Sequence, residues 1–177
     1  RSDVQILVPM NRGTLGAETL NERLQALLNP DGKPVPGYPR IRMGDRVIQT
    51  RNNYDLDVSN GDVGLVVGPG FDEGSICIRF DHGDIYYSNE AIDDLRLAYA
   101  LSIHKSQGSE YPAVIVPLHT QHFMMLRRNL LYTAVTRAQK LLVLVGPSRA
   151  VAMAIKRHDA QKRYTLLRRL VDESRVH

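Results

Sequence analysis

The sequence predicts an α/β fold, in which a parallel sheet with helices on both faces is interrupted by a small β-barrel. Residues 113–116 and 141–145 are short, wholly apolar runs, typical of strands buried on both faces of a parallel sheet. Segments of helical period lie next to such runs. Residues 44–88 instead contain short β-rich runs divided by turn residues, a pattern typical of a small barrel or sandwich.

Length and composition allow one ordinary domain that carries a small insertion. The chain has 177 residues, of which 43% are hydrophobic, and its net charge of +4 permits a polyanionic partner without requiring one. The single cysteine, Cys77, excludes an intrachain disulfide, so we expect a cytoplasmic protein. No signal peptide is recognisable, and no apolar run approaches the ~20 residues that span a membrane. Because the chain begins with Arg1 rather than Met, we expect it to be part of a longer protein.

The first elements place an arginine beside a strand end. Residues 4–8 form a β-rich run, and a polar loop with Arg12 and two glycines follows. Residues 17–28 are predicted to form a helix with one apolar face, made by Leu20, Leu24, Leu27 and Leu28. Arg12 therefore lies where parallel sheets bind ligands, although a solvated loop arginine is the alternative.

The middle of the chain changes character. Residues 29–40 are rich in proline and glycine and are predicted to be an irregular linker, neither helix nor strand. Strands are then expected at 46–51, 63–67, 75–80 and 84–88. This size suits an SH3-like barrel, and a helical turn at 90–95 returns the chain to the host sheet.

Residues 97–118 are the centre of the prediction. They comprise a buried strand, a polar turn that opens a short helix, and a second buried strand. His, Lys, Ser, Gln and Glu side chains gather between the two strands, where packing alone would need none of them, so we expect a binding site. A helix over 123–139, a strand at 141–145, a helix over 148–156 and a basic helix near 161–171 complete the chain; the basic helix is either a solvated face or a DNA contact.

Four segments together resemble the superfamily 1B DNA helicases of the RecD-like type. SIHKSQGSE (102–110) resembles motif V, and LLYTAVTRAQK (130–140) resembles motif VI. PMNRGTLGAETLN (9–21) resembles the motif IV region, and GDRVIQTRNNYDLDVSNGDVG (44–64) resembles the start of the SH3-like insert. The resemblance implies a RecA-like motor lobe (2A) formed by residues 1–37 and 97–177, with an SH3-like domain (2B) inserted at 38–96.

The resemblance also implies the activity, cofactor and partners. The intact protein would be an ATP-dependent 5′–3′ DNA helicase or translocase that acts in DNA repair and recombination. No GxxxxGK[ST] phosphate-binding loop is present, so the fragment alone is not expected to hydrolyse ATP. The Mg²⁺ ligands are expected on the N-terminal motor lobe of the same polypeptide. The other implied partners are single-stranded DNA and subunits of a nuclease complex.

The resemblance assigns nucleotide contacts to two segments. Arg137 would be an arginine finger on the γ-phosphate, since a guanidinium offers planar, permanently charged donors; a surface arginine is the alternative. Arg12 would be a second γ-phosphate contact across the same cleft. Gly108 and Glu110 would lie near the nucleotide, with the Glu110 carboxylate accepting from ribose hydroxyls. Gln107 would link this loop to motif VI or to the phosphates.

The expected DNA contacts lie in two places. Ser102, His104 and Lys105 would bind backbone phosphates, although His104 could instead be satisfied by neighbouring backbone. In the insert, a base could stack on Tyr54 beside Arg51, Asn52 and Asn60. Turn formation by these asparagines is the alternative interpretation.

Other functions remain open from the sequence. The chain could be a stand-alone nucleic-acid binding module that uses only the barrel, or the helicase part of a conjugative relaxase. The six histidines show no metal-ligand spacing, so no metal site is predicted in this chain.

Overall fold

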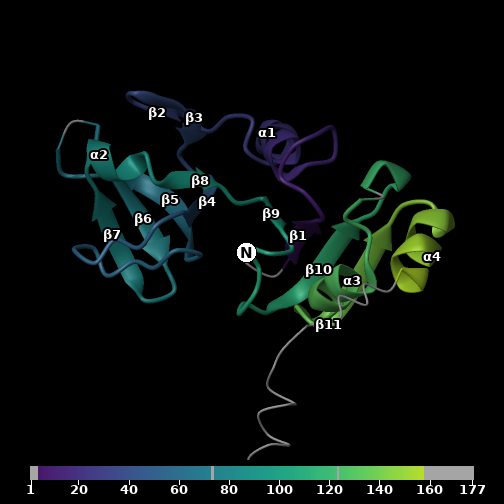
Figure 1. Ribbon diagram of the computed structural model, residues 1–177. Coiled ribbons are helices and arrows are strands. Elements are labelled where there is room, and N and C mark those ends of the chain that lie inside the picture. The colour runs from purple at the N-terminus through teal and green to yellow at the C-terminus, as the bar shows by residue number, and fades with distance from the viewer. Residues whose placement is uncertain (1–3, 73, 123, 158–177) are drawn as a thin grey trace, which may run out of the picture.

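A four-stranded parallel sheet forms one part of the molecule (Figure 1); the computed structural model describes residues 4–72, 74–122 and 124–157. In spatial order its strands are β11 (Ala138–Val145), β10 (Tyr111–Pro117), β1 (Val4–Val8) and β9 (Ala100–Ser102). Each neighbouring pair is parallel. The parallel sheet expected from the apolar runs is therefore confirmed.

The helices agree with the prediction in part. α1 (Ala17–Leu28) and α4 (Ser148–Lys156) have the expected bounds. The helix expected over 123–139 is wrong in extent, because α3 is only Arg128–Val135 and a short 3-10 helix, η1 (Thr120–His122), precedes it. α3 ends before residue 139 because β11 begins at Ala138, which pairs with Tyr111 of β10. Sheet pairing therefore overrides the helical period of these residues. The basic helix near 161–171 lies outside the described residues.

The buried face of α1 is not the predicted leucine face. Ala17, Asn21 and Gln25 are buried, whereas Leu27 and Leu28 are 74% and 62% exposed. Buried amides need hydrogen-bond partners, and Asn21 has them: its Nδ2 donates to Leu97 O and Ala100 O, and its Oδ1 accepts from the Ala100 N–H. α1 therefore packs a polar face, rather than an apolar one, against the residues at which the chain returns to the parallel sheet.

An antiparallel sheet with the order β7-β6-β5-β4-β8 forms the second part of the molecule. Its strands are β4 (Arg46–Gln49), β5 (Val63–Pro69), β6 (Ile76–Phe80), β7 (Gly83–Tyr87) and β8 (Leu95–Leu97), and α2 (Asn89–Ile92) precedes β8. The separate antiparallel sheet is consistent with the predicted SH3-like insert.

The linker predicted at 29–40 does contain strands. β2 (Pro34–Val35) and β3 (Tyr38–Arg42) form a two-stranded hairpin with a glycine, Gly37, at φ +79° in its turn. Proline is tolerated at the ends of short edge strands, where no ladder N–H is required. Proline content therefore misled the prediction here.

Two apolar cores stabilise the two parts. The first lies between the parallel sheet and the helices α3 and α4, and includes Leu7, Leu101, Val114, Val116, Leu126, Leu130, Ala134, Ala150 and Ala154. The second core is formed by buried side chains of the antiparallel sheet, including Val47, Val66, Ile76, Ile78, Phe80 and Tyr87. None of the helices in the described ranges combines the length and the apolar character needed to cross a bilayer.

Candidate functional site

The parallel sheet presents its loops at two opposite ends. At its carboxyl end, Val8 of β1 pairs with Ser102 of β9, and the loops at 9–16 and 103–110 begin there. At its amino end, Tyr111 of β10 pairs with Ala138 of β11. Residues 103–110 therefore run from the carboxyl end of the sheet to the amino end. They do so as consecutive turns, so the short helix expected in this segment does not form.

Arg137 is held at the amino end of the sheet against the end of this crossing segment. Its Nη1 donates to Ser109 O at 3.0 Å, its Nε donates to Thr133 O at 3.3 Å, and its Nη2 donates to Thr136 Oγ1 at 3.3 Å. The Arg137 carbonyl also accepts from the Tyr111 N–H at 2.8 Å. These bonds use three of the five N–H donors of a guanidinium, and the remaining donors can bind an anion.

Glu110 lies at the same end of the sheet and is exposed. Gln139 donates from Nε2 to Glu110 Oε2 at 3.3 Å, which links the segment 102–110 to the segment 130–140. Gln107, predicted to make this link, is exposed, and its N–H donates to His104 O. Gly108 has φ +89°, and a Cβ added there would meet nothing within 4 Å, so backbone conformation rather than close packing requires glycine.

Arg12 is not brought to Arg137. It is exposed in the loop after β1, at the carboxyl end of the sheet, whereas Arg137 directly precedes β11 at the amino end. The whole length of β10 separates these two ends (Figure 1). The expectation that both arginines face one cleft of this chain is therefore wrong, because parallel strands put the end of β1 and the start of β11 on opposite sides.

The carboxyl end of the sheet carries exposed polar side chains instead. His104 and Lys105 are both exposed and lie near the loop of Arg12. Ser102 is only 5% exposed, and its Oγ accepts from the Lys105 N–H at 3.4 Å. Ser102 thus shapes the turn that presents the two basic side chains, rather than standing in solvent itself.

The loop at residues 50–62 combines both interpretations that the sequence left open. Asn52 Oδ1 accepts from the Asn60 N–H at 2.8 Å, and Asn52 Nδ2 donates to the Tyr54 hydroxyl at 3.3 Å. These amides stabilise the loop, as turn formation requires. The Tyr54 ring is nevertheless 87% exposed. Arg51 forms an ion pair with Asp94, with 3.6 Å between Nε and Oδ1. The hydrogen bonds of Asn52 thus stabilise the loop that presents the Tyr54 ring to solvent.

Two residues near the amino end of the sheet were missed from the sequence. Burial raises the pKa of Tyr111, whereas a hydrogen bond with Ser109 and the charges of Arg46 and Arg137 oppose that shift. Arg46 is partly buried and belongs to β4 of the antiparallel sheet, and burial lowers its pKa. Neither position had a local signal, because the barrel strand and the sheet meet only in the folded chain.

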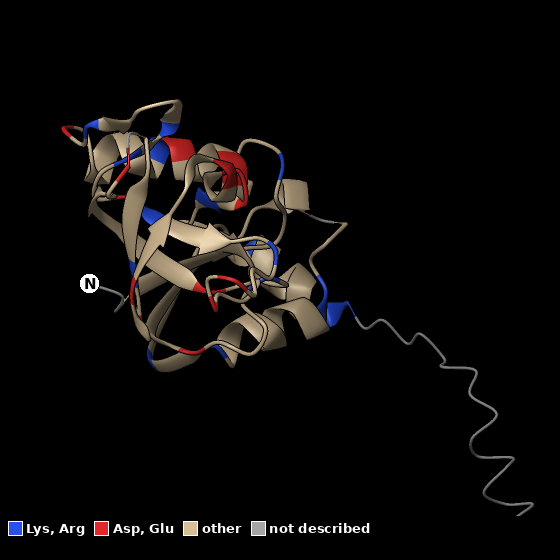
Figure 2. Cartoon of the chain, turned by 90° about the vertical axis from the view of Figure 1, so that its left-hand side faces the viewer, with Lys and Arg blue, Asp and Glu red and all other residues tan. Residues whose placement is uncertain are grey.

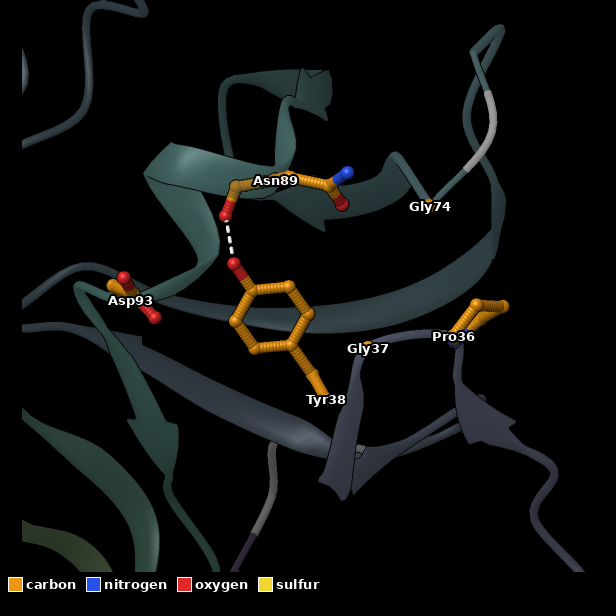
Figure 3. A pocket seen from close by; sticks show the side chains of 6 residues that line it. All are labelled: Pro36, Gly37, Tyr38, Gly74, Asn89 and Asp93. Atoms are coloured by element: carbon orange, nitrogen blue, oxygen red, sulfur yellow. Dashed lines mark hydrogen bonds between the residues drawn. The ribbon is translucent and has the colours of Figure 1, made fainter.

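A pocket of about 680 Å³ lies in the antiparallel part (Figure 3), lined by Pro36, Gly37, Tyr38, Gly74, Asn89 and Asp93. The Tyr38 hydroxyl donates to Asn89 O. Burial raises the pKa of Tyr38, and the charges of Asp93 and Glu90 raise it further. The pocket has no basic lining residue and is negatively charged, so it is unsuited to a nucleotide phosphate.

Lys and Arg positions alternate with Asp and Glu positions along the ribbon in the view of Figure 2. Within the residues that the structure describes, no group of His, Cys, Asp and Glu could hold a metal ion. Anion binding by this chain would therefore depend on local contacts such as Arg137 and Lys105.

Two family models match two separate regions of the chain. Residues 97–145 match the UvrD-like helicase C-terminal domain, and residues 20–80 match the ATP-dependent RecD-like DNA helicase SH3 domain. The chain is 38% identical over 169 residues to the ATP-dependent RecD2 DNA helicase of Deinococcus radiodurans, which covers 94% of this chain and 23% of that protein. It is 34% identical over 154 residues to the RecBCD enzyme subunit RecD of Mycolicibacterium smegmatis, covering 86% of this chain and 27% of that protein.

The fold is also similar to a solved helicase structure. The crystal structure of Pif1 helicase from Bacteroides in complex with ADP-AlF3 and ssDNA superposes with a TM-score of 0.60 at 20% identity, covering 99% of this chain and 46% of that one. The chain spans about a quarter of the length of the two curated relatives, 23% and 27%.

Proposed function

We propose that this chain is the C-terminal region of a RecD-like helicase, with the SH3 domain inserted, and that it supplies the second half of an ATP-driven motor on single-stranded DNA. The division that we propose is a motor lobe at residues 1–37 and 97–177 and a barrel at 38–96. The relative from Deinococcus radiodurans, which is named an ATP-dependent RecD2 DNA helicase, supports the activity of the whole protein.

The position of Arg137 carries the proposal. Its guanidinium is already held at Ser109 and keeps unused donors at the amino end of the sheet. An arginine at this position can stabilise the charge that develops on a transferring γ-phosphate, without reorganisation during the reaction. Because the chain lacks a phosphate-binding loop, the nucleotide would be held mainly by the N-terminal lobe of the same polypeptide.

Other residues at this end have supporting roles in the proposal. Glu110 would accept from ribose hydroxyls, and Gln107 would contact phosphates or the segment of Arg137. ATP would be bound with Mg²⁺, whose ligands we assign to the N-terminal lobe, since no metal-ligand cluster occurs among the described residues of this chain. Closing the two lobes would then bring Arg137 to the nucleotide, which couples hydrolysis to domain movement.

The DNA strand would bind on other surfaces. Arg12, His104 and Lys105 at the carboxyl end of the sheet would contact phosphates, and Tyr54 would stack on a base. We thus propose Arg12 as a DNA contact, since it lies on the side of His104 and Lys105. Similarity to RecD subunits of RecBCD enzymes supports the further proposal that the parent protein joins a nuclease complex.

The proposal is tested with the fragment and the full-length parent in parallel. The fragment should bind a fluorescent oligo(dT) with a log affinity that falls linearly as log salt rises, and it should not hydrolyse ATP. The parent should hydrolyse ATP when single-stranded DNA is added. A parent that lacks a phosphate-binding loop and any ATPase activity would favour a stand-alone binding module instead.

A further inference from the structure

A buried carboxylate lies where the barrel joins the parallel-sheet part, and the proposed function gives it no role. Asp45 directly precedes β4, and it is 0% exposed. Its Oδ2 accepts from Gln25 Nε2 at 2.5 Å and from the Arg42 N–H at 2.7 Å. Its Oδ1 accepts from Asn29 Nδ2 at 2.7 Å and from the Tyr99 hydroxyl at 2.9 Å.

Three of these four donors come from outside the barrel. Gln25 lies in α1, Asn29 is the residue that ends α1, and Tyr99 directly precedes β9. Among the ion pairs of the described residues, none includes Asp45. A buried carboxylate without a cation requires hydrogen bonds to compensate its lost hydration. The donors and Asp45 must therefore keep their relative positions.

The next residue, Arg46, is tied to a different element. Its guanidinium donates to Val4 O and to Gln5 Oε1, both at 3.0 Å, and both acceptors belong to β1. Gln5 is itself 0% exposed and donates from Nε2 to Ala98 O and Tyr99 O, each at 3.2 Å. The consecutive residues Asp45 and Arg46 are thus fixed to α1 and to β1. These two attachments restrain both the orientation of the barrel and its distance from the parallel sheet.

We propose that Asp45 is a positioning residue that holds the barrel and the parallel sheet as one rigid unit. The loop at 50–62 then keeps a constant orientation relative to the carboxyl end of the sheet. This consequence for DNA rests on the proposed function: a strand that contacts both Tyr54 and Lys105 meets a preorganised track, and preorganisation reduces the entropic cost of binding.

The orientation can be measured on this chain alone, without DNA or ATP. Residual dipolar couplings of backbone amides in β1, β9, β10 and β11, and of those in β4 to β8, should fit one alignment tensor in the wild-type chain. In Asp45→Asn, which keeps the size of the side chain but loses one acceptor oxygen, the single-tensor fit should be lost. In the control Asp84→Asn, which removes an exposed ion pair with Arg79, it should be retained.

A second variant keeps the test decisive if Asp45→Asn does not fold. Tyr99→Phe with Gln25→Ala removes two donors and leaves the carboxylate, and it should also require two tensors. Two tensors in a folded variant support the inference. One shared tensor in a folded variant, with at most a lower melting temperature, would overturn it and leave Asp45 a merely structural residue.

The consequence for the motor is measured separately in the full-length parent. Asp45→Asn should raise the single-stranded DNA concentration for half-maximal ATP hydrolysis by about tenfold, equivalent to ~1.4 kcal/mol of lost preorganisation, with little change in kcat. If Asp45→Asn requires two alignment tensors but leaves the half-saturating DNA concentration unchanged, the positioning role of Asp45 is supported and the proposed DNA track is contradicted. A fall in kcat alone would contradict the positioning role.

Discussion

The amino end of the parallel sheet holds in place the side chain that we propose for the nucleotide, whereas the surfaces that we propose for DNA leave theirs in solvent. Arg137 donates to three protein oxygens, while Tyr54 is 87% exposed and Arg12 and Lys105 project from loops. A fixed cation suits a transition state, because it needs no reorganisation when charge develops beside it. Exposed rings and cations suit a flexible strand, which they can follow as it moves. The two proposed sites of this chain would therefore be prepared by opposite means.

The largest expected effect tests the fixed site. Arg137→Ala in the full-length parent should lower kcat for ATP hydrolysis by roughly 10³–10⁵, the range known for arginine fingers, while nucleotide binding is largely spared. Steady-state ATPase assays and binding of a fluorescent nucleotide measure the two quantities. Arg149→Ala, an exposed arginine of α4, is the control and should behave as the wild type. Normal turnover in Arg137→Ala would remove Arg137 from the reaction.

A smaller effect is expected at the exposed ring. Tyr54→Ala should weaken single-stranded DNA binding by about tenfold, since stacking of a base on an aromatic side chain contributes about 1–3 kcal/mol. Fluorescence anisotropy at low salt measures the affinity. Phe71→Ala, which removes another exposed ring of the barrel, should leave the affinity unchanged. Equal affinities of wild type and Tyr54→Ala would favour turn formation as the purpose of this loop.

Phosphate contacts should have smaller effects that depend on salt. Arg12→Ala and Lys105→Ala should each lower the slope of log affinity against log salt by about 0.7, the value per contact for single strands. Lys33→Ala, an exposed lysine before β2, provides the control. If Arg12→Ala instead abolished ATP turnover and left the slope unchanged, Arg12 would belong to the nucleotide site and the contrast between the two ends of the sheet would fail.

The smallest effect concerns stability at the carboxyl end of the sheet. Burial and the charge of His119 lower the pKa of His122, which is 1% exposed in η1 after β10. Below about pH 6.5 the unfolded chain then binds more protons than the folded chain, so acidification should reduce stability. The urea midpoint should fall between pH 7.5 and 5.5, and it should fall less in His122→Gln than in the control His82→Gln. Equal pH slopes in all three proteins would contradict this.

Much of the fold was accessible from local patterns. Apolar runs predicted β10 and β11, helical period predicted α1, and turn residues predicted most strands of the antiparallel sheet. The errors arose where a local pattern competes with a distant partner. Proline suggested an irregular linker where β2 and β3 pair, and leucine spacing suggested the wrong buried face of α1.

For the candidate site, the structure bears on positions and contacts. The polar residues between β9 and β10 predicted a binding segment, and the hydrogen bond from Gln139 to Glu110 joins this segment to the segment 130–140. Arg46 and Asp45 could not be recognised, because their partners lie in α1, β1 and the residues before β9.

The sequence by itself determined most of the elements in this protein, the order in which they occur, and the segments that carry polar side chains, since these depend on neighbouring residues and their spacing. Only the tertiary structure decided that Arg12 and Arg137 lie at opposite ends of one sheet, and that Asp45 ties the barrel to α1. The physical reason is that these relations depend on which distant strands pair and in which direction. Hydrogen bonds and apolar burial settle that pairing across the whole chain.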